Sequence, residues 1–322
     1  MRLDCFFFAA AFVASLSLAQ EKRPEYPARP VRLIVPSSIG SPPDLVGRMI
    51  GEKLAAALGQ TIVADNRAGA TGIIGLDMAA KAAGDGYTLA VFGMPFVVIT
   101  HLVSKMPYDT ERDLTAVAQV ALHYHLLAMR ADSPVSSVAA LVDAARAKPN
   151  AFRFSSGGNG TPAHLSSALF IREAKLRLQH IPYRAAPAAA QALLSGEVDL
   201  MIGSVAMLSP HVKAGRLRPL ATPAPKRIPA HPAVPTFAEA GYPGVRVHDW
   251  IGIVAPAGTP RSVIARLNSE IESAAGMPDI RHRLESIGME SAHAGPEVFG
   301  QHIRAELKRW KALVREAGIT AD

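Results

Sequence analysis

Cysteine is nearly absent from this chain of 322 residues. The one cysteine, Cys5, lies ahead of an apolar run from Phe6 to Leu18. Arg2 gives this run a basic start, and the small residues around Ala19 match a cleavage site, so residues 1–19 are predicted to be a signal peptide. The chain that remains after cleavage has no thiol, which excludes disulfides, cysteine nucleophiles and cysteine metal sites.

Aromatic residues and long hydrophobic runs are also scarce. Aromatic residues make up 6% of the chain, and no run of lysine and arginine is interleaved with them. We therefore expect no nucleic-acid partner, although the net charge is +7. After the N-terminal run, no segment is apolar for long enough to cross a bilayer. These features predict an exported, soluble protein of the periplasm.

Motifs for catalysis are missing as well. The segment 202–206 lacks the last glycine of a G-x-S-x-G nucleophile elbow, and there is no P-loop. His123 and His125 would point the same way on an extended segment, which leaves zinc as an alternative. No neighbouring carboxylate pattern accompanies them, however, and we expect no metal, no cofactor and no enzyme activity.

The chain is organised around the stretch from Val31 to Gly59. An apolar run at 31–35 suits a buried strand, and a helical pattern follows a small polar loop. Ser41 is predicted to be the N-cap of this helix, with Asp44 at the capping-box position and Gly59 as the C-terminal stop. Backbone N–H groups and the helix dipole then converge on the loop, which is a site for a carboxylate or phosphate.

Two more turns of this kind follow. One joins a strand at 61–64 to a helix through about Ala83, and its glycine spacing differs from that of a dinucleotide-binding loop. The other spans 156–164 after a strand at 152–155, with Thr161 as N-cap and Pro162 at the first helical position. Several anion-holding loops without catalytic motifs favour a binding protein.

Strand and helix patterns alternate along the chain, which predicts an α/β fold with parallel sheets and right-handed crossovers. We predict that domain 1 contains residues 25–119 and 249–322, and that domain 2 contains residues 120–248. Two crossings would join the domains and leave a cleft between them. The C-terminal part is predicted to be helical at 262–275, 278–287 and 296–317, with Trp310 in the core.

The order of these motifs resembles the substrate-binding receptors of tripartite tricarboxylate transporters, the Bug receptor family. The resemblance covers nearly the whole chain after residue 25. Its motifs include Tyr26-Pro27, Val31–Pro36, Asp65-Asn66-Arg67, Asp85-Gly86-Tyr87, Ser156–His164, His180-x-Pro182-Tyr183, Trp250-x-Gly252 and Ala255-Pro256-x-Gly258-Thr259-Pro260. It implies a type II periplasmic binding protein with two α/β domains, a two-crossing hinge and a central cleft. It also implies that the protein closes on a small carboxylate without a cofactor and hands it to membrane permease subunits.

The resemblance also implies which residues bind the ligand. From domain 1 these are Ser37, Ser38, Ile39, Gly40, Ser41, Gly69, Ala70, Thr71 and Gly72, and from domain 2 they are Ser156, Gly158, Gly160, Thr161, Gly203 and Ser204. Gly203 stands where many members have an aspartate that would suit an ammonium group. Ile39 makes the mouth of the site more apolar. Our hypothesis is therefore that the ligand is an organic acid without an amino group. An aromatic or branched acid is one form of this hypothesis.

These observations predict a monomeric extracytoplasmic solute-binding receptor for a small organic acid. Arg67 and Arg184 are rival contacts for the anion, although Arg67 is expected to be a structural partner of nearby backbone or of Asp65. Two alternatives stay open. One is an exported α/β hydrolase or transferase that uses Ser156 with His164, and the other is a ligand sensor for a membrane signalling partner.

Overall fold

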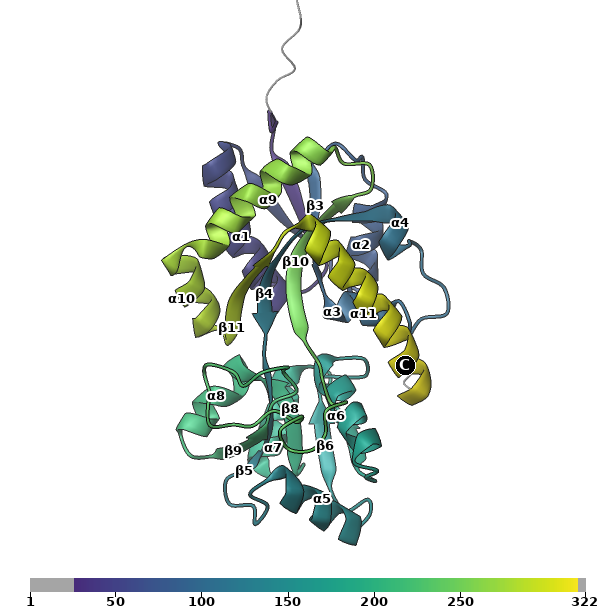
Figure 1. Cartoon of the computed structure of the whole chain (residues 1–322), viewed down its shortest axis with the longest axis vertical. Helices are drawn as coiled ribbons and strands as arrows, with labels where there is room; N and C mark the ends of the chain where they lie inside the picture. The colour runs from purple at the N-terminus through teal and green to yellow at the C-terminus, as the bar shows by residue number, and fades with distance from the viewer. Residues whose placement is uncertain (1–25, 318–322) are drawn as a thin grey trace, which may run out of the picture.

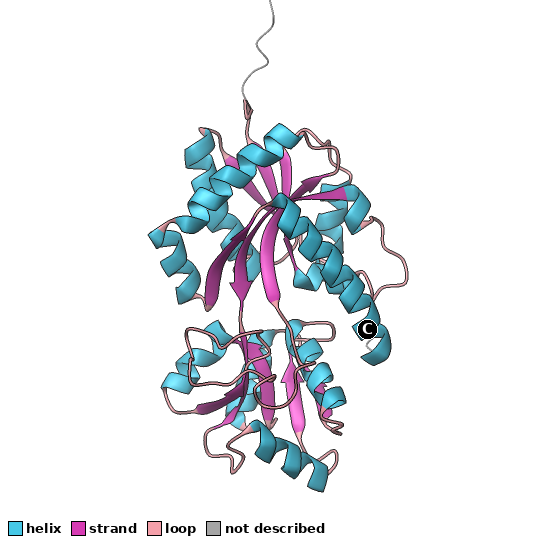
Figure 2. Ribbon diagram, in the orientation of Figure 1, coloured by secondary structure: helices cyan, strands magenta, loops and turns pink. Residues whose placement is uncertain are grey.

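The computed structural model describes residues 26–317, which form two lobes joined by two crossings of the chain (Figures 1 and 2). The predicted signal peptide, residues 1–19, lies outside the described residues. None of the helices within residues 26–317 is both long and apolar enough to span a bilayer.

The first lobe is built on a six-stranded sheet with the order β11-β4-β10-β3-β1-β2. Its strands are β1 (Val31–Val35), β2 (Ile62–Asn66), β3 (Thr88–Gly93), β4 (Leu114–His123), β10 (Asp249–Pro256) and β11 (Met289–Ala294). Its helices are α1 (Pro42–Leu58), η1 (Ala70–Gly72), α2 (Ile73–Ala80), α3 (Met94–Ile99), α4 (Thr110–Asp113), α9 (Arg261–Gly276), α10 (Pro278–Ser286) and α11 (Pro296–Ala317).

Helices cover both faces of this sheet. Consecutive side chains of β1 point to opposite faces, and both kinds are buried. Leu33 packs with α1 and α9, whereas its neighbour Ile34 belongs to the cluster that contains α2, α3 and α11. Trp310 of α11 is 1% exposed, which confirms its predicted place in the core.

The second lobe is built on a five-stranded sheet with the order β7-β6-β8-β5-β9. Its strands are β5 (His125–Arg130), β6 (Arg153–Ser156), β7 (Gln179–Pro182), β8 (Leu200–Ser204) and β9 (Leu217–Ala221). Its helices are α5 (Val138–Ala147), α6 (Pro162–Glu173), α7 (Ala186–Ser195) and α8 (Val205–Lys213). Helices α6 and α7 pack against β6 and β8.

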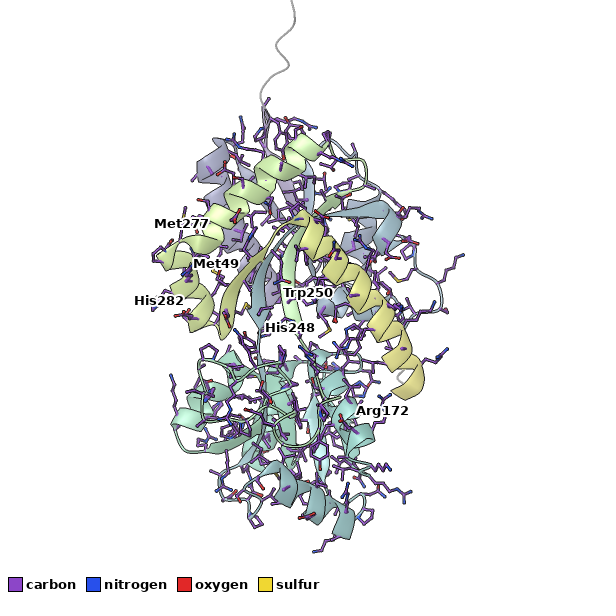
Figure 3. The ribbon with its side chains drawn as sticks, viewed as in Figure 1. Met49, Arg172, His248, Trp250, Met277 and His282 are labelled. Carbon is purple, nitrogen blue, oxygen red and sulfur yellow. The ribbon has the colours of Figure 1, made fainter. Side chains whose placement is uncertain are left out.

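The lobes are joined where β4 passes into β5 through Tyr124, and where the chain returns from β9 to β10 through an irregular segment (Figure 1). The two crossings meet, because Asp249 at the start of β10 is paired with His123 at the end of β4. His248 and Trp250, labelled in Figure 3, flank this point on the second crossing.

The register of the strands sets where the connecting loops lie. Ile251, near the start of β10, is paired with Gly93 at the end of β3, and β1 and β2 run parallel to β3. In the other sheet, His125 at the start of β5 is paired with Ser204 at the end of β8, and β6 and β7 run parallel to β8. The carboxyl ends of these six strands therefore face the hinge from both sides.

Several expectations from the sequence were wrong. The sheets are mixed rather than parallel, because β10 and β5 run antiparallel to their neighbours. A strand that enters a sheet from the other lobe runs opposite to strands whose carboxyl ends point to that lobe. The three predicted C-terminal helices are confirmed as α9, α10 and α11, but β11, which was not predicted, lies between α10 and α11. Helix α2 ends at Ala80 rather than near Ala83, and β2 runs from Ile62 to Asn66 rather than from 61 to 64.

One prediction concerns Gly252, where β10 passes under α11. A Cβ at this position would lie 2.5 Å from Cζ of Phe299 and 2.6 Å from the carbonyl oxygen of Ala118. Because backbone cannot move aside cheaply, Gly252→Ala should lower the free energy of unfolding by about 1–3 kcal/mol, measured by urea denaturation. The matched control is Gly276→Ala at the exposed end of α9, where nothing lies within 4 Å of an added Cβ. Equal stabilities of the two variants would contradict this reading of the packing.

Candidate ligand-binding loops

The loop after β1 ends at the N-terminus of α1. Ser41 is the N-cap residue, as predicted, and Gly59 ends the helix with φ 64°. The predicted capping box is not formed, since the side chain of Ser41 accepts no hydrogen bond from the helix. Its Oγ lies 2.8 Å from Oγ of Ser37 instead, and Asp44 accepts a hydrogen bond from the backbone N–H of Gly40 at 2.9 Å.

Asp44 is a buried carboxylate that holds two loops together. It accepts hydrogen bonds from Nε of Arg48 at 2.9 Å and from Nδ2 of Asn66 at 2.8 Å, and Asn66 also donates to the carbonyl oxygen of Ser37. Burial by itself would raise the pKa of Asp44, but the bonds from Asn66 and Gly40 and the charge of Arg48 together hold this pKa below its usual value. The carboxylate therefore compensates the positive end of α1 from within the protein.

The turn after β2 packs directly against this loop. A Cβ at Gly72 would lie 2.4 Å from Cε1 of Phe96 and 3.1 Å from the carbonyl oxygen of Pro36, so this approach requires glycine. Ala70 and Thr71 adopt positive φ angles of 46° and 51°. Non-glycine residues in this conformation are strained, and such strain is concentrated at functional sites. Both residues are exposed on the hinge side of the sheet.

Arg67, which follows this strand, is held by a neighbouring carboxylate. Its Nε lies 2.9 Å from Oδ1 of Asp65, which confirms the predicted pair. Asp65 also accepts a hydrogen bond from Arg32 at 2.8 Å. Arg184, the other cation considered for the anion, is exposed in the loop before α7.

The loop after β6 is stabilised by its own hydroxyl groups. Thr161 is the N-cap of α6, as predicted, since its Oγ1 accepts a bond from the N–H of His164 and donates to the carbonyl oxygen of Gly158 at 2.8 Å. Gly158 and Gly160 take positive φ angles of 117° and 72°. The loop therefore has a defined shape before any ligand binds.

A histidine that the sequence analysis did not assign supports this loop. Oγ of Ser156 lies 2.7 Å from Nε2 of His180, whose ring is stacked at 4.4 Å on His164 and at 4.7 Å on Phe154. The contact of Ser156 with His180 and its full burial speak against the predicted pairing of Ser156 with His164 as a catalytic dyad. His180 belongs to a motif of the sequence, but only its contacts reveal this role.

Helices α6 and α8 begin differently from α1. Gly203 and Ser204 end β8, and Ser204 is the N-cap of α8. Neither α6 nor α8 has an acidic residue in its first turn. The positive helix ends in the second lobe are therefore not compensated by a carboxylate of the first turn, and they favour an external anion.

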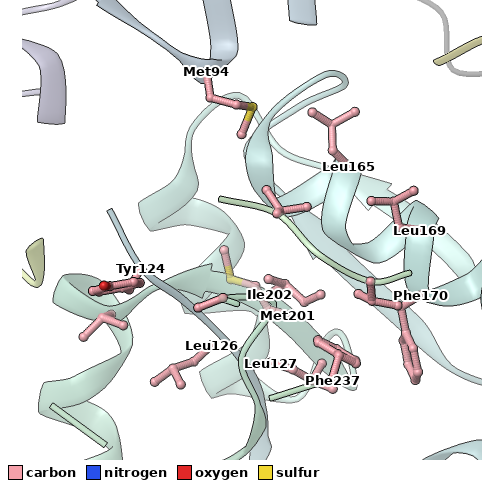
Figure 4. Close-up of a cluster of buried hydrophobic side chains, with 14 of the residues drawn as sticks. Met94, Tyr124, Leu126, Leu127, Leu165, Leu169, Phe170, Met201, Ile202 and Phe237 are labelled. Carbon is pink, nitrogen blue, oxygen red and sulfur yellow. The ribbon is translucent and has the colours of Figure 1, made fainter. Parts of the chain in front are cut away.

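The loops of the two lobes lie on facing sides. A Cβ at Gly160 would come within 2.6 Å of Cδ1 of Leu102, which follows α3 in the first lobe. Met94 at the start of α3 and Leu165 of α6 belong to one hydrophobic cluster (Figure 4). Gly72 packs closely against both Phe96 of α3 and the carbonyl oxygen of Pro36, so α3 connects the first-lobe loops to the loop after β6.

Cavities elsewhere in the first lobe contain none of the predicted binding residues. One of about 550 Å³ lies between α1 and the edge strand β2, and another of about 720 Å³ lies between α4, α9 and α11. Both are open to solvent at the outside of the lobe, away from the hinge. The predicted binding residues thus fall into two groups, one on each lobe, at the carboxyl ends of the strands.

Two mixed α/β lobes with a double crossing are the architecture of periplasmic binding proteins. The chain aligns with the periplasmic binding protein BugD at a TM-score of 0.78 and 28% identity, over 92% of this chain and 100% of that one. It aligns with Rpa4515 of R. palustris, solved with adipate, at 0.81 and 33% identity over 92% and 100% of the two chains. The alignment with MatC (Rpa3494) of Rhodopseudomonas palustris, solved with bound malate, has a TM-score of 0.77 and 31% identity. It covers 90% of this chain and 100% of that one.

Residues 46–319 match the model of the tripartite tricarboxylate transporter family receptor, and the chain belongs to this family. A relative is the UPF0065 protein in the tcbD-tcbE intergenic region of Pseudomonas sp. (strain P51). It is 39% identical over 315 residues, which are 98% of this chain and 94% of the relative. The resemblance found in the sequence is confirmed. The family and these structural neighbours are solute-binding receptors rather than enzymes.

A second prediction follows from the contacts of Asp44. Because the pKa of Asp44 is lowered by folding, its carboxylate stabilises the folded state above the ordinary pKa, and this contribution is lost as the pH falls through the lowered value. Asp44→Asn should cost about 1.5–3 kcal/mol at pH 7, measured by urea denaturation, and the difference from the native protein should shrink below about pH 4.

The control is Asp132→Asn, since Asp132 is exposed and makes only a surface ion pair with Arg130. This change should alter stability by less than about 0.5 kcal/mol. A cost for Asp44→Asn that stays constant from pH 7 to pH 3 would show that the charge of Asp44 is not what stabilises the loops.

Proposed function

We propose that this chain is an exported receptor that captures a small organic carboxylate between its two lobes and delivers it to the permease subunits of a tripartite tricarboxylate transporter. One observation carries the proposal: loops from both lobes face the hinge, and the helix starts of the second lobe have no acidic residue to compensate them. Membership of the receptor family supports the partner, and the predicted signal peptide supports export to the periplasm.

The ligand is held by neutral donors. The backbone N–H groups at the starts of α6 and α8, with the hydroxyl of Ser204, bind one carboxylate group, while the hydroxyl of Thr161 fixes the loop through its bonds to Gly158 and His164. The exposed turn Gly69–Thr71 and Ser38 bind from the first lobe. Each hydrogen bond to a charged group contributes about 1.5–3 kcal/mol, so a few of them support micromolar affinity after the cost of association.

The ligand class is a carboxylic acid with an apolar body and no amino group. Ile39 is 77% exposed in the loop after β1, where it offers an apolar contact to the carbon chain of a ligand. Gly203 provides no carboxylate for an ammonium group. The neighbours solved with adipate and malate are consistent with a dicarboxylate. The protein acts as a monomer and changes no covalent bond of its ligand.

The third prediction is tested by calorimetry with adipate, malate, an aromatic carboxylate, aspartate and glutamate. We expect at least one plain carboxylate to bind, and aspartate and glutamate to bind more weakly, because the site has no partner for an ammonium group. Closure of the lobes should lower the radius of gyration in X-ray scattering when that ligand is added. Tight binding of amino acids alone would contradict the ligand class, and absence of any carboxylate binding would contradict the function.

The fourth prediction concerns Thr161. Thr161→Ala removes the hydroxyl that joins Gly158 to His164 and so fixes the loop at the start of α6. It should weaken binding of the carboxylate about tenfold while lowering stability by only about 1 kcal/mol. Thr61→Ala, an exposed change ahead of β2 on the outer edge of the sheet, is the matched control and should leave affinity unchanged. Equal affinities of the two variants for the carboxylate would contradict the proposal that the start of α6 belongs to the binding site.

A further inference from the structure

The two crossings of the hinge bring three potential metal ligands together. His123 ends β4 and His125 begins β5, with Tyr124 between them, so both rings lie on one side of the first crossing. Asp249 begins β10 on the second crossing and is paired with His123. The sequence around the two histidines contains no carboxylate pattern that would indicate a metal site, because Asp249 is 124 residues further along the chain than His125.

The distances between the ligand atoms are close to those of a metal site. Nδ1 of His123 lies 3.0 Å from Oδ2 of Asp249, and Nε2 of His125 lies 4.0 Å from the same oxygen. One ligand atom from each residue can be chosen so that all three lie within 4.8 Å of one another. Zn²⁺ binds nitrogen and oxygen at about 2.0–2.2 Å, which places tetrahedral ligands roughly 3.3 Å apart. The His123–Asp249 separation is within about 0.3 Å of that value, and Nε2 of His125 would have to move closer to Asp249 by about 0.7 Å.

Burial makes the cluster unusual. The side chains of His123, His125 and Asp249 are 8%, 6% and 6% exposed. The charge of a buried carboxylate must be compensated by its neighbours. Of the two imidazoles, only that of His123 lies within hydrogen-bonding distance of the carboxylate of Asp249. A divalent cation would compensate the charge fully. Two histidines with one carboxylate leave a fourth position for water, as in catalytic and other open zinc sites.

We propose that His123, His125 and Asp249 bind a divalent transition-metal ion, preferentially Zn²⁺, at the hinge. The ion is held by the last residue of a strand in one sheet, the first residue of a strand in the other, and the start of the returning strand. It therefore links both crossings and both lobes at one point. Borderline-soft ions suit this donor set, whereas Mg²⁺ prefers oxygen ligands and retains its water.

The test is a calorimetric titration of the full mature chain, without a histidine tag and freed of metal by a chelator, with Zn²⁺ alone. We expect one Zn²⁺ per chain and no binding of Mg²⁺. Co²⁺ in place of Zn²⁺ should give the visible absorption of a tetrahedral or five-coordinate ion, which reports the ligand set without any substitution. Asp249→Asn, which keeps the shape of the side chain, and His125→Ala should each weaken Zn²⁺ binding at least about 100-fold, since loss of an outer partner alone costs about 10–100-fold.

His282→Ala on the outside of α10 is the control and should bind Zn²⁺ like the native protein (Figure 3). Circular dichroism checks that the Asp249→Asn and His125→Ala variants are folded. If one of them is unfolded, the Co²⁺ spectrum of the native protein still tests the ligand set. Failure of the native chain to take up Zn²⁺ would overturn the proposal and leave the cluster as a hydrogen-bonded link. So would Zn²⁺ binding that Asp249→Asn leaves unchanged, or that depends instead on His302, which lies beside His248. None of these results depends on whether a carboxylate binds.

Discussion

The antiparallel pairing of the crossing strands with the parallel strands of each lobe is the constraint on which the rest depends. Where β10 pairs with β3, and where β5 pairs with β8, the carboxyl end of a parallel strand is fixed against the hinge. Every loop that follows such a strand must then point toward the other lobe. The position of the candidate site is thus a consequence of strand direction, and the residues of the loops determine only what it binds.

The two lobes contribute different electrostatics to this arrangement. In the first lobe, Asp44 compensates the start of α1 and joins the loops after β1 and β2 through Asn66. In the second lobe, α6 and α8 begin without acidic residues, and the loop after β6 is supported by hydroxyl groups and the stacked ring of His180. Both lobes therefore offer loops of defined shape, but α6 and α8 of the second lobe begin without an acidic residue in the first turn.

Features with a strong local signal could be predicted from the sequence. The first strand, the N-cap residue Thr161 and the stop at Gly59 depend on neighbouring residues, and the family followed from the order of many such motifs. The sequence did not predict β11, the mixed direction of the sheets, the partner of Ser156 or the approach of Asp249 to His123. Each of these depends on residues far apart in the chain, whose contacts no local pattern records. The ligand-binding residues stay a prediction.

The lobes also share buried apolar surface. A continuous hydrophobic cluster includes Phe92 and Met94 from the first lobe, and Leu165 and Phe170 from the second. Figure 4 shows Met94, Leu165 and Phe170 of this cluster. Parting the lobes widely would hydrate this cluster, at about 2.5 kcal/mol for each 100 Å² of apolar area. Hydration of the apolar side chains that meet between the lobes, such as Leu102 beside Gly160, therefore opposes wide opening.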